Sequence, residues 1–209
     1  MADKKKGTSW KFFSSEMVGI AFAVILALWL EGWYEDFQRK ERADEFLERI
    51  KIEVSQNRDD LASAIDGTQE SIDGIGKVFA SGDVTFRTLA PFLEIEGGST
   101  TSSAWTTAQM TQAISEMPVE TVTSLAIIYD SQAYYADYLN YFFQQYADLT
   151  IGIRIGESRL VSARKFQQHL SITNSLARQV LENYDAFLGI KPEEAATPEE
   201  AAPSEKVES

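Results

Sequence analysis

The chain begins with a continuous apolar run and then changes to a helical periodicity. Residues 17–30 read MVGIAFAVILALWL, with no charged side chain. A membrane-spanning helix needs about 20 residues, and the aromatic residues that flank the run on both sides complete this length. The pattern therefore predicts a transmembrane helix over residues 12–34.

This helix is expected to be retained, because the bulky residues that follow the run do not suit a signal-peptide cleavage site. The run is apolar on every face, which argues against an amphipathic helix lying in the membrane interface. A buried core helix of a soluble protein is the alternative, since the run is short. The side chains expected to anchor the chain in lipid are those of Met17, Ile20, Phe22, Ile25, Leu26, Trp29 and Trp33.

Behind the apolar run, buried-type residues recur at alternating spacings of three and four. This spacing is typical of a heptad seam on a long helix that continues from the span. We predict that this helix ends at Gly67 and that a short second helix covers residues 69–80. The seam consists of Ala43, Leu47, Ile50, Val54, Asn57, Leu61 and Ala64.

Asn57 is the polar residue of this seam, and two readings of it stay open. In a self-associating coiled coil, such a residue sets the register between two copies. In a monomeric bundle, it faces a polar partner from another helix.

The second half of the chain predicts a loop followed by three more helices. Residues 82–102 contain Pro91 and the Gly97-Gly98 pair and are expected to form a loop with a helical turn near Leu89. A third helix should begin at Ser102 or Ser103 and end near Met117. It carries Trp105, Met110 and Ile114.

The fourth helix should begin at Pro118, which suits a first turn, and the glycines at 152 and 156 should weaken its end. Its apolar stripe repeats at spacings of three and four from Leu125 to Ile153. A fifth helix has a stripe from Phe166 to Phe187 and ends at Gly189.

The predicted fold class is all-α, with one transmembrane helix leading into a long amphipathic helix and then a helical bundle. We predict a basic cytoplasmic leader over residues 1–11, the span over 12–34 and a helical extracytoplasmic domain over 35–189. Residues 190–209, rich in Pro, Ala and Glu, should form a disordered acidic tail.

Charge restricts the partners and suggests an orientation. The net charge of -13 excludes a nucleic-acid partner, because neutralising phosphates requires clustered Lys and Arg. The excess of basic residues on the N-terminal side of the span predicts that the N-terminus lies in the cytoplasm and the bulk of the chain outside it. The basic residues near the span are Lys4, Lys5, Lys6 and Lys11 before it and Arg39, Lys40 and Arg42 after it.

The sequence shows no motif for catalysis, a cofactor or a metal ion. The chain has no Cys and a single histidine, His169, which we expect at the surface or at the edge of the core. The Gly152–Gly156 segment lacks the third glycine and the preceding strand of a phosphate-binding loop. An enzyme would have to use carboxylates such as Glu94 and Glu96 in the 82–102 loop, or tyrosines.

The fourth helix carries an aromatic series that is too wide for one core stripe. Either this helix packs on several neighbours, or its outer tyrosines meet a protein partner or line a ligand pocket. The candidate partner interface consists of Tyr134, Tyr135, Tyr138, Tyr141, Phe142 and Tyr146.

Loose motifs over about half the chain resemble a widespread group of uncharacterised bacterial single-span membrane proteins. These have a short basic leader, one N-terminal transmembrane helix and an extracytoplasmic helical domain. The likeness implies topology and no activity. It is carried by Glu31, Trp33, Glu41, Arg42, Leu47, Ile50, Glu53, Asn57 and Leu61, and by the segment from Trp105 to Gln132.

The function that these features favour is that of a non-enzymatic, membrane-anchored interaction protein. It would be an accessory or structural subunit of a bacterial inner-membrane or periplasmic complex, with the lipid bilayer and either a protein partner or a second copy of itself as partners. The alternative is a periplasmic helical module that binds a ligand and signals through a partner, since the leader is too short to form an output domain.

Overall fold

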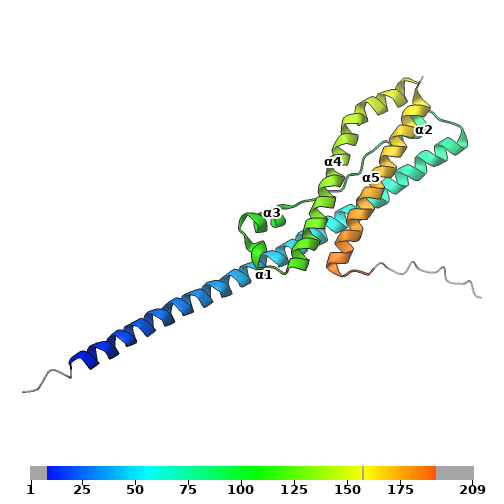
Figure 1. Ribbon diagram of the computed structural model, residues 1–209. Helices are drawn as coiled ribbons and strands as arrows, with labels where there is room; N and C mark the ends of the chain where they lie inside the picture. Colours follow the sequence, from blue (N-terminus) through cyan, green and yellow to red (C-terminus); the bar gives the residue numbers. More distant parts are fainter. Residues whose placement is uncertain (1–8, 157, 192–209) are drawn as a thin grey trace, which may run out of the picture. The chain divides into compact units, whose positions relative to one another are not determined.

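The computed structural model describes residues 9–156 and 158–191, and within these ranges the protein is all-α with no strand. The predicted fold class is therefore confirmed, while most of the predicted leader and tail lies outside the described residues. The elements are α1 (Ser9–Ser81), α2 (Phe86–Leu89), the 3-10 helix η1 (Ala90–Phe92), α3 (Ser103–Met110), the 3-10 helix η2 (Ala113–Glu116), α4 (Val119–Ile155) and α5 (Arg159–Leu188) (Figure 1).

The chain forms two compact units. Unit 1 contains the N-terminal part of α1, up to Ile50, together with residues 103–119. Unit 2 contains the rest of α1, from Lys51, together with residues up to 102 and residues from Glu120 onward. The predicted domain over residues 35–189 thus contributes to both units.

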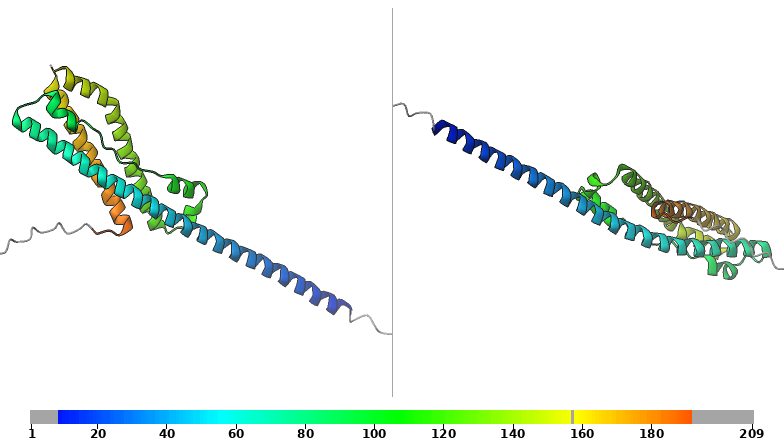
Figure 2. Two further views of the ribbon diagram at one scale, coloured as in Figure 1. Left: turned by 180° about the vertical axis from the view of Figure 1, so that it is seen from behind. Right: turned by 90° about the horizontal axis from the view of Figure 1, so that it is seen from below.

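The predicted end of the first helix at Gly67 is wrong, because α1 continues without a break to Ser81 (Figure 2). Gly67 and Gly74 lie on the side of α1 that the 82–102 segment crosses. A methyl group at Gly67 would overlap the side chain of Glu96, and one at Gly74 would overlap the ring of Phe92. These glycines therefore permit close packing instead of ending the helix.

The heptad seam is buried as predicted, with only Leu47 half-buried. Unit 2 also contains an apolar core shared by α1, the 82–102 segment, α4 and α5. Burial of this apolar surface is the main stabilising term of the unit. The fully buried members of that core include Ile75, Leu89, Phe142, Ile153, Phe166 and Leu170.

The 82–102 segment has the predicted helical turn near Leu89, in the form of α2. Thr85 caps this turn: its Oγ1 accepts from the N–H of Thr88 at 3.2 Å, while the Thr88 side chain accepts from the N–H of Thr85 at 3.1 Å. This reciprocal pair satisfies two backbone donors that a helix end leaves open.

In unit 1, the predicted third helix is interrupted. Regular α-helix ends at Met110, and Gln112 adopts a left-handed conformation with φ 58° before η2 begins. The interruption changes the direction of the chain. As a result, both α3 and the segment that contains η2 bury side chains. Those side chains are Trp105, Ala108, Ala113 and Met117.

α4 and α5 are antiparallel and joined by a tight turn. Gly156, with φ +102°, makes this turn, and Gly189, with φ +71°, ends α5 in a left-handed cap. Both conformations favour glycine. The predicted start at Pro118 and end at Gly189 are confirmed to within one residue.

Candidate functional site

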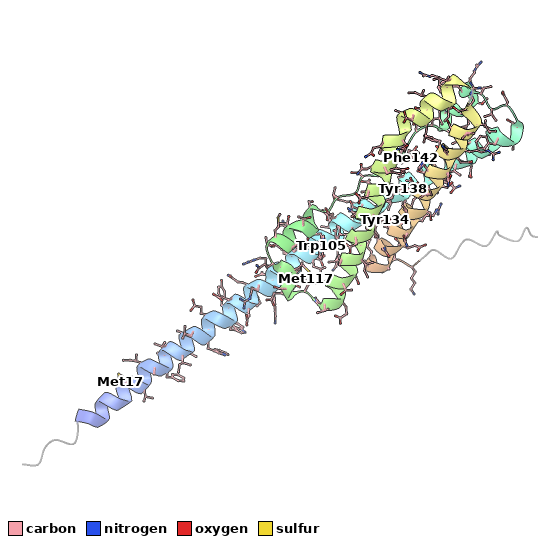
Figure 3. The ribbon with its side chains drawn as sticks, turned by 45° about the horizontal axis from the view of Figure 1, so that its top comes forward. Met17, Trp105, Met117, Tyr134, Tyr138 and Phe142 are labelled. Atoms are coloured by element: carbon pink, nitrogen blue, oxygen red, sulfur yellow. The ribbon has the colours of Figure 1, made fainter. Side chains whose placement is uncertain are left out.

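The apolar segment of α1 is exposed on every side. The seven predicted anchor residues, including Met17 (Figure 3), are all exposed. Among the described residues, α1 is the one helix long and apolar enough to cross a membrane. An exposed apolar surface of this size in water would be costly, so the segment has the surface expected of a membrane anchor.

Unit 2 contains a buried polar network around Asn57. The Asn57 Nδ2 donates to the carbonyl oxygen of Thr101 at 2.8 Å, and the Thr101 N–H donates to Asn57 Oδ1 at 2.9 Å. Gln132 Nε2 also donates to the Thr101 carbonyl, at 3.1 Å. Asn57 therefore faces polar partners inside the bundle, which corresponds to the monomeric reading of the seam.

Two buried tyrosines bond to polar side chains in the same unit, and Tyr184 joins the Asn57 network through Gln132. Tyr184 donates to Gln132 Oε1 at 2.8 Å, and Tyr129 donates to Glu53 Oε1 at 2.7 Å. Burial raises the pKa of Tyr184, and burial together with the hydrogen bond to Glu53 raises the pKa of Tyr129. Both phenols stay protonated near neutral pH and act as donors.

Tyr135 differs from these two tyrosines. Its side chain is fully buried, and its hydroxyl has no hydrogen-bond partner among the described residues. Burial raises its pKa to about 12. A buried hydroxyl without a partner costs free energy, so Tyr135 contributes through the packing of its ring.

A second polar group lies between α4 and α5 around His169. Its Nδ1 is 2.9 Å from the hydroxyl of Tyr138, and its ring stacks on Phe142 with the centroids 5.0 Å apart. Burial and the charge of Lys165 lower the pKa of His169. The half-buried position at the edge of the core agrees with the sequence prediction.

The predicted tyrosine interface is divided by the structure. Tyr135 and Phe142 are buried in unit 2, and Tyr146 is half-buried and donates to the carbonyl oxygen of Leu93 at 3.0 Å. The hydroxyl of Tyr138 forms its hydrogen bond with His169. Figure 3 shows Tyr134, Tyr138 and Phe142 along α4. Of the six residues, only Tyr134 and Tyr141 are exposed to a partner.

These two tyrosines belong to an exposed stripe that begins at Ile127. Ile127, Tyr134 and Tyr141 follow one another at intervals of seven, so they share one face of α4, and 48–64% of each is exposed. We call this set the outer stripe. Asp130 and Asp137 follow Ile127 and Tyr134, respectively, by about one turn of α4. The stripe has the pattern of one side of a helix–helix contact.

A shallow groove continues the outer stripe at its Ile127 end. It has a volume of about 210 Å³ and lies between α4 and α5. Its lining is largely apolar with two polar side chains: Ser124, Ile127, Ile128, Asn183, Ala186 and Phe187.

The surroundings of Glu94 and Glu96, the two carboxylates considered for catalysis, do not resemble an active site. Glu96 folds over Gly67, and its carbonyl oxygen accepts from Thr68 Oγ1 at 3.3 Å. Glu94 is exposed. Over residues 17–156 and 158–191, no cluster of three His, Asp or Glu side chains has a geometry suited to a metal ion.

No protein-family model, curated protein or solved structure matches this chain. Sequence reasoning had identified Asn57, but not the partners of its network. Gln132 could have been predicted as one of these partners, since it is a polar residue at a core position of the α4 stripe. Thr101 could not have been predicted from its residue type, because its backbone and not its side chain forms the principal hydrogen bonds.

Proposed function

We propose that this protein is a non-enzymatic, membrane-anchored interaction protein that serves as an accessory or structural subunit of a bacterial inner-membrane or periplasmic complex. In this proposal, the apolar segment of α1 spans the membrane with the N-terminus in the cytoplasm. Unit 2 then binds a protein partner on the periplasmic side.

The observation that carries the proposal is the outer stripe of α4. A helix in a monomeric bundle normally buries its apolar stripe and presents polar residues opposite. α4 buries Leu125, Ile128 and Tyr135 and also exposes the heptad-spaced outer stripe. This second apolar face is available for a partner.

The chemistry of the outer stripe indicates the kind of partner. Large side chains at heptad spacing suit the apolar seam of another helix, and aromatic residues are favoured at interface cores. Asp130 and Asp137 beside the stripe would pair with Lys or Arg on the edge of that helix. The partner surface is therefore an amphipathic helix with a basic flank.

The test is mild detergent extraction of the tagged full chain, followed by mass spectrometry of the purified complex. We expect a defined membrane complex at constant stoichiometry. The Ile127→Asp/Tyr134→Asp variant should lose that complex at least tenfold, since a carboxylate at the centre of an apolar contact is left unpaired. Circular dichroism should show an unchanged helix content, because both positions are exposed.

Ile52→Asp is the matched control, because Ile52 is also an exposed isoleucine in unit 2 but lies on α1. It should retain the complex. Recovery of the chain alone, or equal loss of the complex in both variants, would refute the proposal. If the α4 variant retained the complex, the outer stripe would not be the interface, and the partner would bind another surface.

A further inference from the structure

The end of unit 2 at the α4–α5 turn combines exposed aliphatic side chains with several basic residues. Ile151 and Ile155 at the end of α4 and Leu160 and Val161 at the start of α5 are each 45–73% exposed. They belong to the last turn of α4 and the first turn of α5, and Figure 1 shows these two helix ends next to each other. We call these four residues the aliphatic tip.

Basic residues lie among and just after the residues of the aliphatic tip in the sequence. Residues 151–165 contain four basic residues and one acidic residue, in a chain whose net charge is -13. None of the four forms an ion pair with any residue of the described ranges, and each has an exposed or half-exposed side chain. They are Arg154, Arg159, Arg164 and Lys165.

The packing of the arginines holds them at this end of the unit. The Arg154 guanidinium lies over the ring of Phe86 at 5.1 Å, and that of Arg164 lies over Phe79 at 5.9 Å. Arg159 Nε donates to the carbonyl oxygen of Ile153 at 2.9 Å. Contacts with rings and a carbonyl oxygen orient the cations without neutralising them.

We propose that the aliphatic tip and its four cations form a docking surface for an anionic phospholipid bilayer. Aliphatic side chains at the end of a helical hairpin can enter the headgroup region, and guanidinium groups bind lipid phosphates. Each basic residue near an anionic surface strengthens the attraction. The positive charge of the tip is complementary to anionic headgroups. Its exposed aliphatic side chains favour a bilayer over an acidic protein surface, because the acyl boundary beneath the headgroups can bury them.

This surface is separate from the outer stripe, so its test does not depend on the proposed protein partner. Because the chain has no Cys, one introduced thiol gives a unique labelling site. Ser158 is exposed at the tip, and its side chain makes no capping hydrogen bond. Ser158→Cys therefore places a polarity-sensitive fluorophore there with little disturbance, and Ser171→Cys, further along α5, is the control position.

The labelled full chain is reconstituted in nanodiscs and mixed with vesicles, with spin-labelled lipid placed in one membrane or the other. Bilayers of phosphatidylcholine alone are compared with equimolar phosphatidylcholine and phosphatidylglycerol. We expect quenching and a blue shift at position 158 with the anionic bilayer, little change at position 171, and weakening by salt. The membrane that carries the quencher identifies whether the anchoring bilayer or a second one is bound.

Substitutions separate the contribution of charge from that of apolar contact. Arg154→Gln/Arg164→Gln should weaken anionic binding about 30-fold, from the loss of two basic residues at the surface. Ile155→Ser/Val161→Ser should remove the blue shift. The charge control is Arg178→Gln, an exposed arginine further along the same helix α5, which should leave binding unchanged.

Two results would overturn the proposal. A label at position 158 that stays unquenched in both bilayers would exclude lipid as the occupant of the tip. Equal quenching with and without phosphatidylglycerol, unaffected by the arginine substitutions, would exclude the recognition of anionic lipid. Circular dichroism of each variant checks that neither result follows from unfolding.

Discussion

The side chain of Asn57 forms two hydrogen bonds with the backbone of Thr101, one through its amide nitrogen and one through its oxygen, although the residues are 44 positions apart. This pair fixes the end of the 82–102 segment to the middle of α1. The backbone N–H and carbonyl groups of Thr101, which lie outside any helix, are thereby satisfied inside unit 2.

Asn57→Ala should lower the free energy of unfolding by about 2 kcal/mol, because both bonds are lost and Thr101 backbone groups lose their partner. Thermal unfolding of the full chain in detergent, followed by circular dichroism, measures the change. Thr101→Ala is the control: it removes only a hydroxyl whose contact with Asn57 is 3.4 Å long, so stability should hardly change. Equal effects of the two substitutions would contradict this account.

Tyr129→Phe and Tyr135→Phe should have different effects, although both remove one hydroxyl from a buried tyrosine of α4. Tyr129 donates to the carboxylate of Glu53, so its loss should cost about 2 kcal/mol. The Tyr135 hydroxyl has no partner among the described residues, so its loss should leave stability unchanged or raise it. Chemical denaturation of both variants tests this, and equal destabilisation would be inconsistent with it.

The buried tyrosines predict a loss of stability in alkali. The folded state retains phenolic protons that the unfolded chain releases above a pKa of about 10. The contribution of these tyrosines to stability should therefore be constant below that pH and fall as the pH rises towards the folded value, which is about 12 for Tyr135. Unfolding free energies at several alkaline pH values measure the slope. Tyr135→Phe should reduce it, and an identical slope in that variant would argue against the assignment.

Gly74→Ala and Gly76→Ala should change stability in opposite directions. A methyl group at Gly74 meets the Phe92 ring, and relieving this overlap should cost about 1–3 kcal/mol. At Gly76 the nearest atom is Gln167 Nε2 at 3.6 Å, an ordinary contact. There the substitution should gain about 0.5–1 kcal/mol from the helix propensity of Ala. The melting temperatures of the two variants test this prediction. A stabilised Gly74→Ala variant would show that the 82–102 segment does not pack on α1 as described.

The sequence by itself determined the helices and the faces they bury. The repeat from Ala43 to Ala64 specified which side of α1 lies in the core, because one face of a helix recurs every three to four residues. The same reasoning located the α4 and α5 stripes and the cap at Gly189. The continuous apolar run at residues 17–30 likewise identified the segment with the surface of a membrane anchor.

Tertiary structure alone decided how residues far apart in the chain meet. Gly67 has the local signature of a helix end, but its missing side chain provides room for Glu96. The tyrosines of α4 are chemically alike in sequence, yet packing within unit 2 buries Tyr135 and leaves Tyr134 exposed. Periodicity reports only the local geometry of one helix, whereas these outcomes depend on packing between helices.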